Sequence, residues 1–182
     1  MASGSLQKTQ VRILLTMLTA AMMAMIFFFS TETAERSDRT SGSISMAVIS
    51  VLYPDYENLP AEKMKEIYDN VQYSVRKTAH FTEYLILGVL MRLCLESWFG
   101  RRKLIAPVSW ASGTLYACTD ELHQMMTDGR SGLWMDVLLD SFGVLTGIIG
   151  VTLILVLLKE MRIKKNVPEH CTGKSGNPTE HW

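Results

Sequence analysis

Apolar residues in this chain gather in blocks rather than at the spacing of an amphipathic helix, and short charged clusters separate the blocks. The first block runs from Ile13 to Phe29 and is interrupted only by two threonines. A stretch of this length satisfies its backbone hydrogen bonds in lipid only as a helix. The pattern therefore predicts a first membrane span over residues 13–30, preceded by a cytoplasmic N-terminal segment of residues 1–12.

A cleaved signal peptide is the competing interpretation of this first block, because Lys8 and Arg12 would form its positively charged leader. The apolar core, however, is longer than the core of most such peptides. Glu32 before Ala34 also makes a poor cleavage site, since signal peptidase prefers small residues there. A retained membrane helix is the favoured interpretation.

Three later blocks predict further spans. Residues 137–158 carry a single charge, Asp140, and are followed at once by a basic run. Residues 104–124 have about the length that crosses roughly 30 Å of hydrocarbon at 1.5 Å per residue. The block over residues 79–99 is the weakest, because ionisable residues surround its uncharged middle. These residues are His80, Glu83, Arg92 and Glu96.

The distribution of positive charge decides whether residues 79–99 cross the membrane. Basic clusters precede the first block, separate the second from the third, and follow the fourth. Positive residues in short loops mark the cytoplasmic side, and the three clusters share one side only if residues 79–99 cross. The sequence thus predicts four spans with both termini in the cytoplasm. Residues 31–76 would then form an extracytoplasmic segment.

This extracytoplasmic segment contains an amphipathic helical pattern after Pro60, which is typical of a helix lying on the membrane surface. The predicted fold is all-α: an integral membrane bundle of four transmembrane helices plus an extracytoplasmic interfacial helix. Residues 13–158 would form one membrane domain. Residues 159–182 would form a cytoplasmic tail that is first basic and then disordered.

Composition adds little to this pattern, because 48% hydrophobic residues and a mean hydropathy of +0.13 would also suit an apolar soluble domain. The formal net charge is zero, so no overall field favours a nucleic-acid partner. The three cysteines form neither a disulfide pattern nor a metal motif, and no cofactor is expected. Membrane lipids are the expected partners, and the oligomeric state is left open.

Ionisable groups inside a span are costly in lipid and are therefore candidates for function. In the predicted topology, three spans place such groups at the outer side of the membrane. The candidate binding residues are Lys77, His80, Tyr84, Asp120, Glu121, Gln124, Arg130, Asp136 and Asp140. Spacings of three or four residues put most members from one helix on one stripe, and Gly143 with Gly147 lets another helix approach closely. Arg130, in the short outer connection, is expected to cover the site as a lid or anion clamp.

Two segments resemble the signatures of the VanZ-like family, membrane proteins named for a determinant of teicoplanin resistance. They are RKTAHFTEYLILG, which starts at Arg76, and DELHQMMTDGRSGLWMDVLLDSFGVLTG, which starts at Asp120. The resemblance covers roughly residues 70–150 and implies a multi-pass protein of a bacterial plasma membrane. It carries over every candidate residue above except Asp140, which stands where the family usually has Asn and adds a negative charge when ionised.

The favoured function is non-catalytic. The outer site would bind the polar head of a lipid or cell-wall precursor, with Lys77 and Arg130 holding phosphate or carboxylate. By resemblance, such binding would serve resistance to teicoplanin-type glycopeptides, or envelope homeostasis. The precursor or the glycopeptide itself would be the partner.

Two other functions remain open. A membrane-embedded hydrolase or transferase would act on a lipid-linked or peptidoglycan substrate, with His80, Asp120 and Glu121 as catalytic candidates. Its weaker variant places a divalent cation at the two acidic residues, although no compact metal-binding spacing is present. A transporter is disfavoured, because polar residues do not continue through the inner half of the spans. A purely structural salt-bridge network competes with all three functions.

Overall fold

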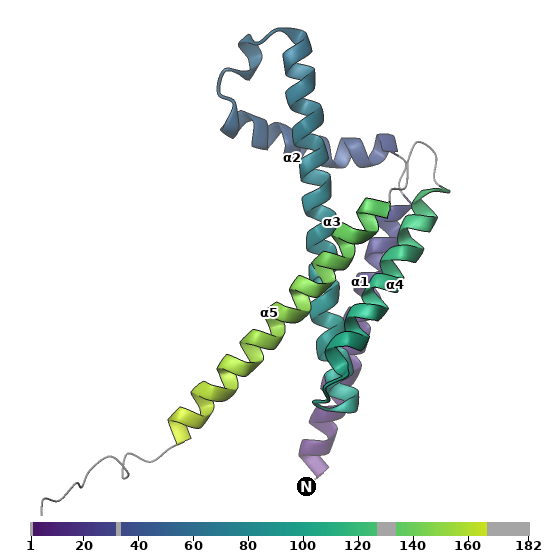
Figure 1. Ribbon diagram of the computed structural model, residues 1–182, viewed down its shortest axis with the longest axis vertical. Helices are drawn as coiled ribbons and strands as arrows, with labels where there is room; N and C mark the ends of the chain where they lie inside the picture. The colour runs from purple at the N-terminus through teal and green to yellow at the C-terminus, as the bar shows by residue number, and fades with distance from the viewer. Residues whose placement is uncertain (1, 32–33, 127–133, 167–182) are drawn as a thin grey trace, which may run out of the picture.

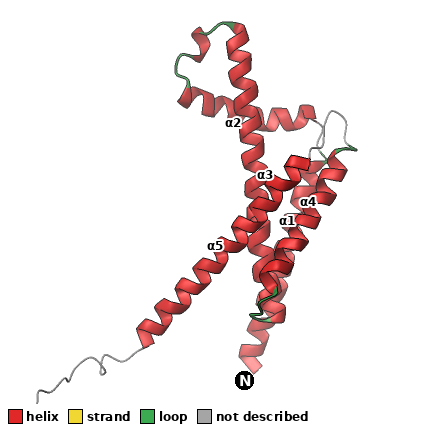
Figure 2. Cartoon of the chain, viewed as in Figure 1, coloured by secondary structure: helices red, strands yellow, loops and turns green. Residues whose placement is uncertain are grey.

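The structure is a computed structural model that describes residues 2–31, 34–126 and 134–166, which are helical apart from short connections. In chain order the elements are α1 (Ala2–Ser30), α2 (Ala34–Leu52), a 3₁₀ turn η1 (Tyr56–Asn58), α3 (Ala61–Phe99), α4 (Ile105–Gln124) and α5 (Trp134–Asn166). The described ranges contain no strand (Figure 2). The predicted all-α fold class is confirmed.

Three helical segments are long and apolar enough to cross a membrane by length and composition. They are Ser5–Ser30, Ala61–Phe99 and Trp134–Lys165. With 20 residues, α4 has the length to cross, but polar residues such as Ser109 and Thr114 lower its hydropathy. The chain is a multi-pass membrane protein, and a crossing by α4 stays a prediction.

The bundle has two ends of opposite character. At the upper end of the bundle in Figure 1, below the first half of α3, α1 and α4 finish and α5 begins. Asp120 belongs to the end of α4 and Asp136 to the start of α5. At the lower end lie Arg12 and the connection between α3 and α4, where Arg12 Nε donates a hydrogen bond to the Ser97 carbonyl oxygen at 2.8 Å. The last turns of α5, which carry the third basic cluster, also point toward this side. We call these the acidic end and the basic end.

Two predicted boundaries differ from the structure because hydropathy marks only the apolar part of a helix. The predicted interfacial helix after Pro60 and the predicted span from residue 79 belong to one helix, α3, which contains no proline. Its 39 residues make about 58 Å, so about half of α3 extends beyond a hydrocarbon layer of about 30 Å. Similarly, α1 begins at Ala2 and α5 continues through the basic run to Asn166. The rest of the tail predicted to be disordered lies outside the described residues.

The helix that lies across α3 is α2 (Figure 1). Ser45 and Ile49 of α2 are almost fully buried, and its Gly42 lies against the Tyr68 hydroxyl of α3. The opposite side of α2 exposes apolar residues, including Ile44 and Val51. An exposed apolar side on a helix that starts beside the end of α1 suits the surface of a bilayer. The segment after Pro60 is instead the first part of α3, and α2 lies across it.

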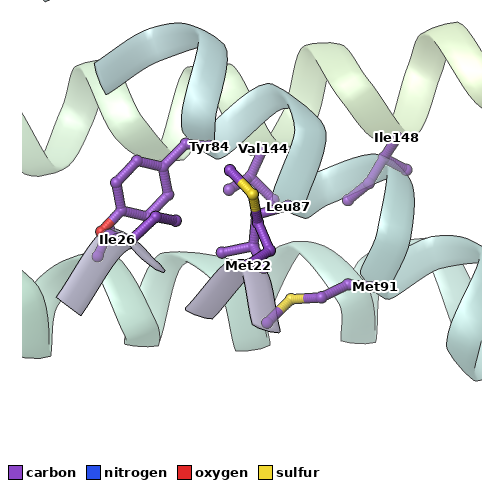
Figure 3. Packing of buried hydrophobic residues seen from close by; sticks show 8 residues of the cluster. Met22, Ile26, Tyr84, Leu87, Met91, Val144 and Ile148 are labelled. Atoms are coloured by element: carbon purple, nitrogen blue, oxygen red, sulfur yellow. The ribbon is translucent and has the colours of Figure 1, made fainter. Parts of the chain in front are cut away.

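The core forms where α1, α3, α4 and α5 meet. Tyr84 and Leu87 of α3 are fully buried and converge with Val144 of α5 and Ile26 of α1 (Figure 3). By contrast, most large apolar side chains of α1 and of the second half of α5 are exposed, as expected of surfaces that face lipid. The Tyr116 hydroxyl of α4 donates to the Met23 carbonyl oxygen of α1 at 2.5 Å, which ties these two helices together.

Glycines allow α3 and α5 to pack with their backbones in contact. A Cβ atom on Gly147 would collide with the Leu85 backbone, and one on Gly88 would collide with the Val144 backbone. A Cβ on Gly143 would lie 2.7 Å from the Phe81 carbonyl oxygen. The small-residue pair predicted from the sequence is thus the point at which α5 crosses α3.

Two charged residues of α3 near the basic end pair with each other, and Arg101 of the following connection joins them. Arg92 Nη1 donates to Glu96 Oε2 at 2.5 Å, one helical turn away, and Arg101 Nε donates to the other carboxylate oxygen at 2.8 Å. This network accounts for the charges in the second half of α3 by local pairing.

A hydroxyl group links α4 to α5 inside the bundle. Ser141 Oγ accepts a hydrogen bond from Trp110 Nε1 at 3.1 Å and lies 2.7 Å from Thr114 Oγ1. Hydrogen bonds between membrane helices contribute about 1 kcal/mol. Ser141→Ala is expected to lower the free energy of unfolding by about 1 kcal/mol in SDS titrations of the purified protein. Thr152→Ala, which removes a hydroxyl bonded only within α5, is the control and should have a smaller effect.

Candidate functional site

Three helices bring polar side chains together at the acidic end. The spacing of Lys77 and His80 places both on one stripe of α3, while α4 contributes residues from its last turn and α5 residues from its first two turns. A small cavity forms between them. It is lined by Lys77, His80, Glu121, Gln124, Asp136, Leu139 and Asp140.

The cavity lies about one membrane thickness along α3 from the end of that helix. His80 is 19 residues from the end of α3 at Phe99, which corresponds to about 28 Å and is close to the thickness of the hydrocarbon layer. The cavity has a volume of about 10 Å³, which accommodates a single group of the size of a water molecule. Only one small polar group can therefore enter the cavity in this conformation.

Lys77 connects α3 to α5 by an ion pair with Asp136. Both side chains are about one-fifth exposed, so the pair is only partly screened by solvent. The sequence analysis assigned Lys77 to a phosphate or carboxylate of a ligand. In the structure, its charge is already balanced by a carboxylate of the protein.

The two neighbouring acidic residues of α4 lie in different surroundings. Glu121 lines the cavity, whereas Asp120 does not and instead accepts a hydrogen bond from Gln124 Nε2 at 2.9 Å. Consecutive residues of an α-helix point about 100° apart, which separates the two carboxylates. Asp120 faces Tyr84, a fully buried residue of the core (Figure 3).

Asp140 is the most deeply buried acidic residue of the site, with 2% of its surface exposed. It lines the cavity, and its Oδ1 atom has no hydrogen-bond partner among the described residues. An unsatisfied buried carboxylate oxygen costs free energy unless a donor reaches it.

His80 is the candidate acid or base of the site. Its Nδ1 atom lies 4.0 Å from Oε2 of Glu83, one helical turn further along α3, and its side chain contributes to the cavity wall. An imidazole and the Glu121 carboxylate thus share one cavity. This combination is able to accept and donate protons.

The structure therefore brings together most of the residues predicted from the sequence. Six of them line the cavity, while Tyr84 and Asp120 lie next to it. Arg130, the predicted lid, lies outside the described residues. Leu139 was missed, although its position three residues after Asp136 would have placed it on the same helical stripe.

The described residues contain no group of three His, Cys, Asp or Glu side chains that could hold a metal ion. The weaker variant of the enzyme hypothesis placed a cation between Asp120 and Glu121. Their different orientations do not favour that arrangement, because Asp120 is bound to Gln124 and lies outside the cavity wall.

A comparison with protein families finds a match that covers the residues of the site. The VanZ/LLP1 family matches residues 15–157, a range that includes α3, α4 and most of α5, the helices that line the cavity. The chain belongs to the VanZ/LLP1 family. No curated protein and no solved structure matches it. The match confirms the resemblance seen in the two signature segments and extends it to α1 and to most of α5.

Proposed function

We propose that this VanZ/LLP1 protein binds the polar head of a lipid or of a lipid-linked cell-wall precursor in the outer leaflet of a bacterial plasma membrane. The observation that supports this proposal is the convergence of six polar residues from three helices on one cavity at the acidic end. Polar groups inside a membrane bundle are costly, so their convergence on one cavity supports a functional site.

The proposed orientation follows from the basic end. Two of the three basic clusters lie at that end, and the third lies toward the same side, opposite the cavity. Since positive clusters of short loops stay in the cytoplasm, both termini would lie inside and the cavity would open toward the outside. A ligand of the outer leaflet then reaches the cavity without crossing the membrane.

The small volume of the cavity restricts how a ligand binds. One group of the head would enter between Glu121 and Asp140, while the rest of the head and the acyl chains would stay outside against the helices. A protein that holds a cell-wall precursor in this way would limit the access of a lipid-tailed glycopeptide to it. We therefore propose a role in resistance to teicoplanin-type antibiotics or in envelope homeostasis.

Antibiotic susceptibility tests this role. A glycopeptide-sensitive Gram-positive host producing the wild-type protein is expected to become more resistant to teicoplanin than to vancomycin. Glu121→Gln should abolish the gain, because it removes the charge from the cavity wall while keeping the size of the side chain. Glu160→Gln, an exposed position of α5 far from the cavity, is the matched control and should keep the gain. Minimum inhibitory concentrations are compared at equal amounts of membrane-inserted protein.

Two outcomes would contradict the proposed role. Wild-type protein that is well inserted but causes no selective gain would count against the link to teicoplanin. A gain retained by Glu121→Gln would count against the cavity as its origin.

A membrane-embedded hydrolase or transferase is the second candidate. It is favoured by one observation, the shared position of His80 and Glu121 on the cavity wall. Incubation of the purified protein with a lipid-linked precursor, followed by mass spectrometry, separates the two candidates. A new product that depends on both residues would support catalysis, whereas binding without turnover would support the first proposal.

A further inference from the structure

We infer that the group which enters the cavity is a hydroxyl group, carried by the glycerol headgroup of a lipid or by a sugar of a lipid-linked precursor. This inference rests on the proposed function and specifies the chemistry of the ligand. It follows from an unsatisfied buried oxygen atom in the cavity wall, from charged neighbours that already have partners, and from a volume that fits one small group.

Asp140 supplies the atom that needs a partner. It is 2% exposed, and its Oδ1 atom has no hydrogen-bond partner within the part of the chain that the structure describes. Asp140 lines the cavity together with Lys77 and Asp136, whose side chains are about one-fifth exposed. The cavity thus joins side chains that solvent reaches to one that it does not. A small group that enters beside the exposed side chains would meet the unsatisfied oxygen.

The charged residues of the cavity wall do not require a charged ligand. Lys77 forms an ion pair with Asp136, so these two charges cancel. His80 and Glu121 both have interactions of their own. What the described wall lacks is a partner for a single oxygen atom, and a hydrogen bond supplies that partner without any charge on the ligand.

A hydroxyl group satisfies this oxygen in either protonation state of the carboxyl group. If Oδ1 carries no proton, it accepts a hydrogen bond from the O–H group, and if it carries the proton, it donates to the hydroxyl oxygen. An ammonium group only donates, and an ionised phosphate or carboxylate only accepts. Each of these ions would therefore suit one state of Asp140 alone, whereas a hydroxyl group suits both.

Two further residues of the wall suit a hydroxyl group on a carbon atom. Gln124 is buried, and its Nε2 donates to Asp120 Oδ2 at 2.9 Å, while the carbonyl oxygen of an amide accepts hydrogen bonds. Gln124 belongs to α4 and Asp140 to α5, so a hydroxyl group between them would bridge the two helices. Leu139 lines the same cavity and offers an apolar surface to the carbon atom that carries the hydroxyl group.

The volume of the cavity limits the ligand to one such group. A volume of about 10 Å³ suits a hydroxyl group, which is comparable in size to a water molecule. Phosphate, carboxylate and trimethylammonium groups contain several heavy atoms and would require the helices to separate. A hydroxyl group also reproduces the hydrogen bonds of a water molecule, so it can take the place of one without leaving a polar atom unsatisfied.

Two lipids that differ only in hydroxyl groups test this inference on the purified full-length protein. The protein is placed in nanodiscs that contain equal amounts of phosphatidylglycerol and phosphatidylpropanol with identical acyl chains, and native mass spectrometry counts the lipids that remain bound. Both lipids carry the same charge, so only the hydroxyl groups can produce a preference. The wild type is expected to retain phosphatidylglycerol about fivefold better, the gain that one net hydrogen bond provides.

Two substitutions of Asp140 separate a hydrogen bond from a charge. Asp140→Asn keeps a donor and an acceptor on an uncharged group and should keep the preference for phosphatidylglycerol. Asp140→Val removes both and should retain the two lipids equally, and an unchanged amount of bound phosphatidylpropanol would show that this variant is folded. Glu160→Gln, far from the cavity, should behave as the wild type. Loss of the preference in Asp140→Asn as well would overturn the inference, because the carboxyl group itself would then be required.

Competition identifies the source of the hydroxyl group. A polyprenyl diphosphate that carries a disaccharide represents the cell-wall precursor. Displacement of phosphatidylglycerol by an equal amount of this precursor would assign the site to the sugar, and failure in excess would assign it to the glycerol headgroup. Equal retention of the two phospholipids, together with a precursor affinity that Asp140→Val leaves unchanged, would overturn the hydroxyl inference while leaving headgroup binding intact. Absence of any retained lipid or precursor would instead count against the proposed function.

Discussion

Gly147→Leu is expected to lower the free energy of unfolding by about 3 kcal/mol, the largest effect of any single substitution considered for this protein. A side chain at this position would collide with the Leu85 backbone of α3, which cannot move aside as a flexible side chain can. The two helices would have to separate, and the core around Val144 would lose contacts. Unfolding of the purified protein by SDS in mixed micelles measures the effect.

The same helix provides a control for the Gly147 substitution. Gly150 is one turn further along α5, and a Cβ atom there would meet no other atom within 4 Å. Gly150→Leu increases the volume and the helix propensity of α5 by the same amount but should leave the stability unchanged or slightly raised. If both substitutions destabilised the protein equally, close packing of α3 against α5 would not be the cause.

Lys77→Met is expected to lower the free energy of unfolding by about 2 kcal/mol, because it leaves the partly buried Asp136 carboxylate without its cation. The repulsion between Asp136 and Asp140, one turn apart on α5, would then be uncompensated. Adding Asp136→Asn to Lys77→Met should recover most of the lost free energy of unfolding, because both charges of the pair are then removed. The same SDS titration measures all three variants.

The control for Lys77→Met is another lysine of α3. Lys65 is exposed in the half of the helix beyond the cavity, so Lys65→Met should change the stability by less than about 0.5 kcal/mol. A double variant as unstable as Lys77→Met alone would mean that the loss comes from the apolar stem of the lysine and not from its charge.

Substitutions at the Lys77–Asp136 pair and at Asp140 distinguish a purely structural network from a binding site. The Lys77–Asp136 pair is a structural link, because its two charges cancel inside the protein. The Oδ1 atom of Asp140, by contrast, has no hydrogen-bond partner among the described residues. A network that served stability alone would lose stability when Asp140 is replaced by Val. A binding site would lose ligand preference while stability stays the same or rises, since a buried carboxylate is removed.

Hydropathy and helical spacing predicted most of the membrane helices, and the polar side of each, from the sequence alone. The apolar blocks at residues 13–30 and 137–158 lie within α1 and α5, because a membrane span needs a length of apolar residues that few other structures require. The members of one helical stripe, such as Asp136 and Asp140, were also identified correctly. Their spacing is fixed by the 3.6-residue period within a single helix.

Only the tertiary structure shows how the helices pack against one another. The spacing of residues within one helix carries no information about that packing. The rotation of α4 against α3 places Glu121 in the cavity and Asp120 beside Tyr84, although the sequence analysis predicted the same role for both acidic residues. The crossing of α5 over α3 gives Lys77 its partner Asp136, far away in the chain, and leaves Asp140 with an unsatisfied oxygen. Sequence pattern determined which residues each helix presents on one side. Close packing at the glycines of α3 and α5 determined which of those sides face one another, because backbone contact permits few rotations.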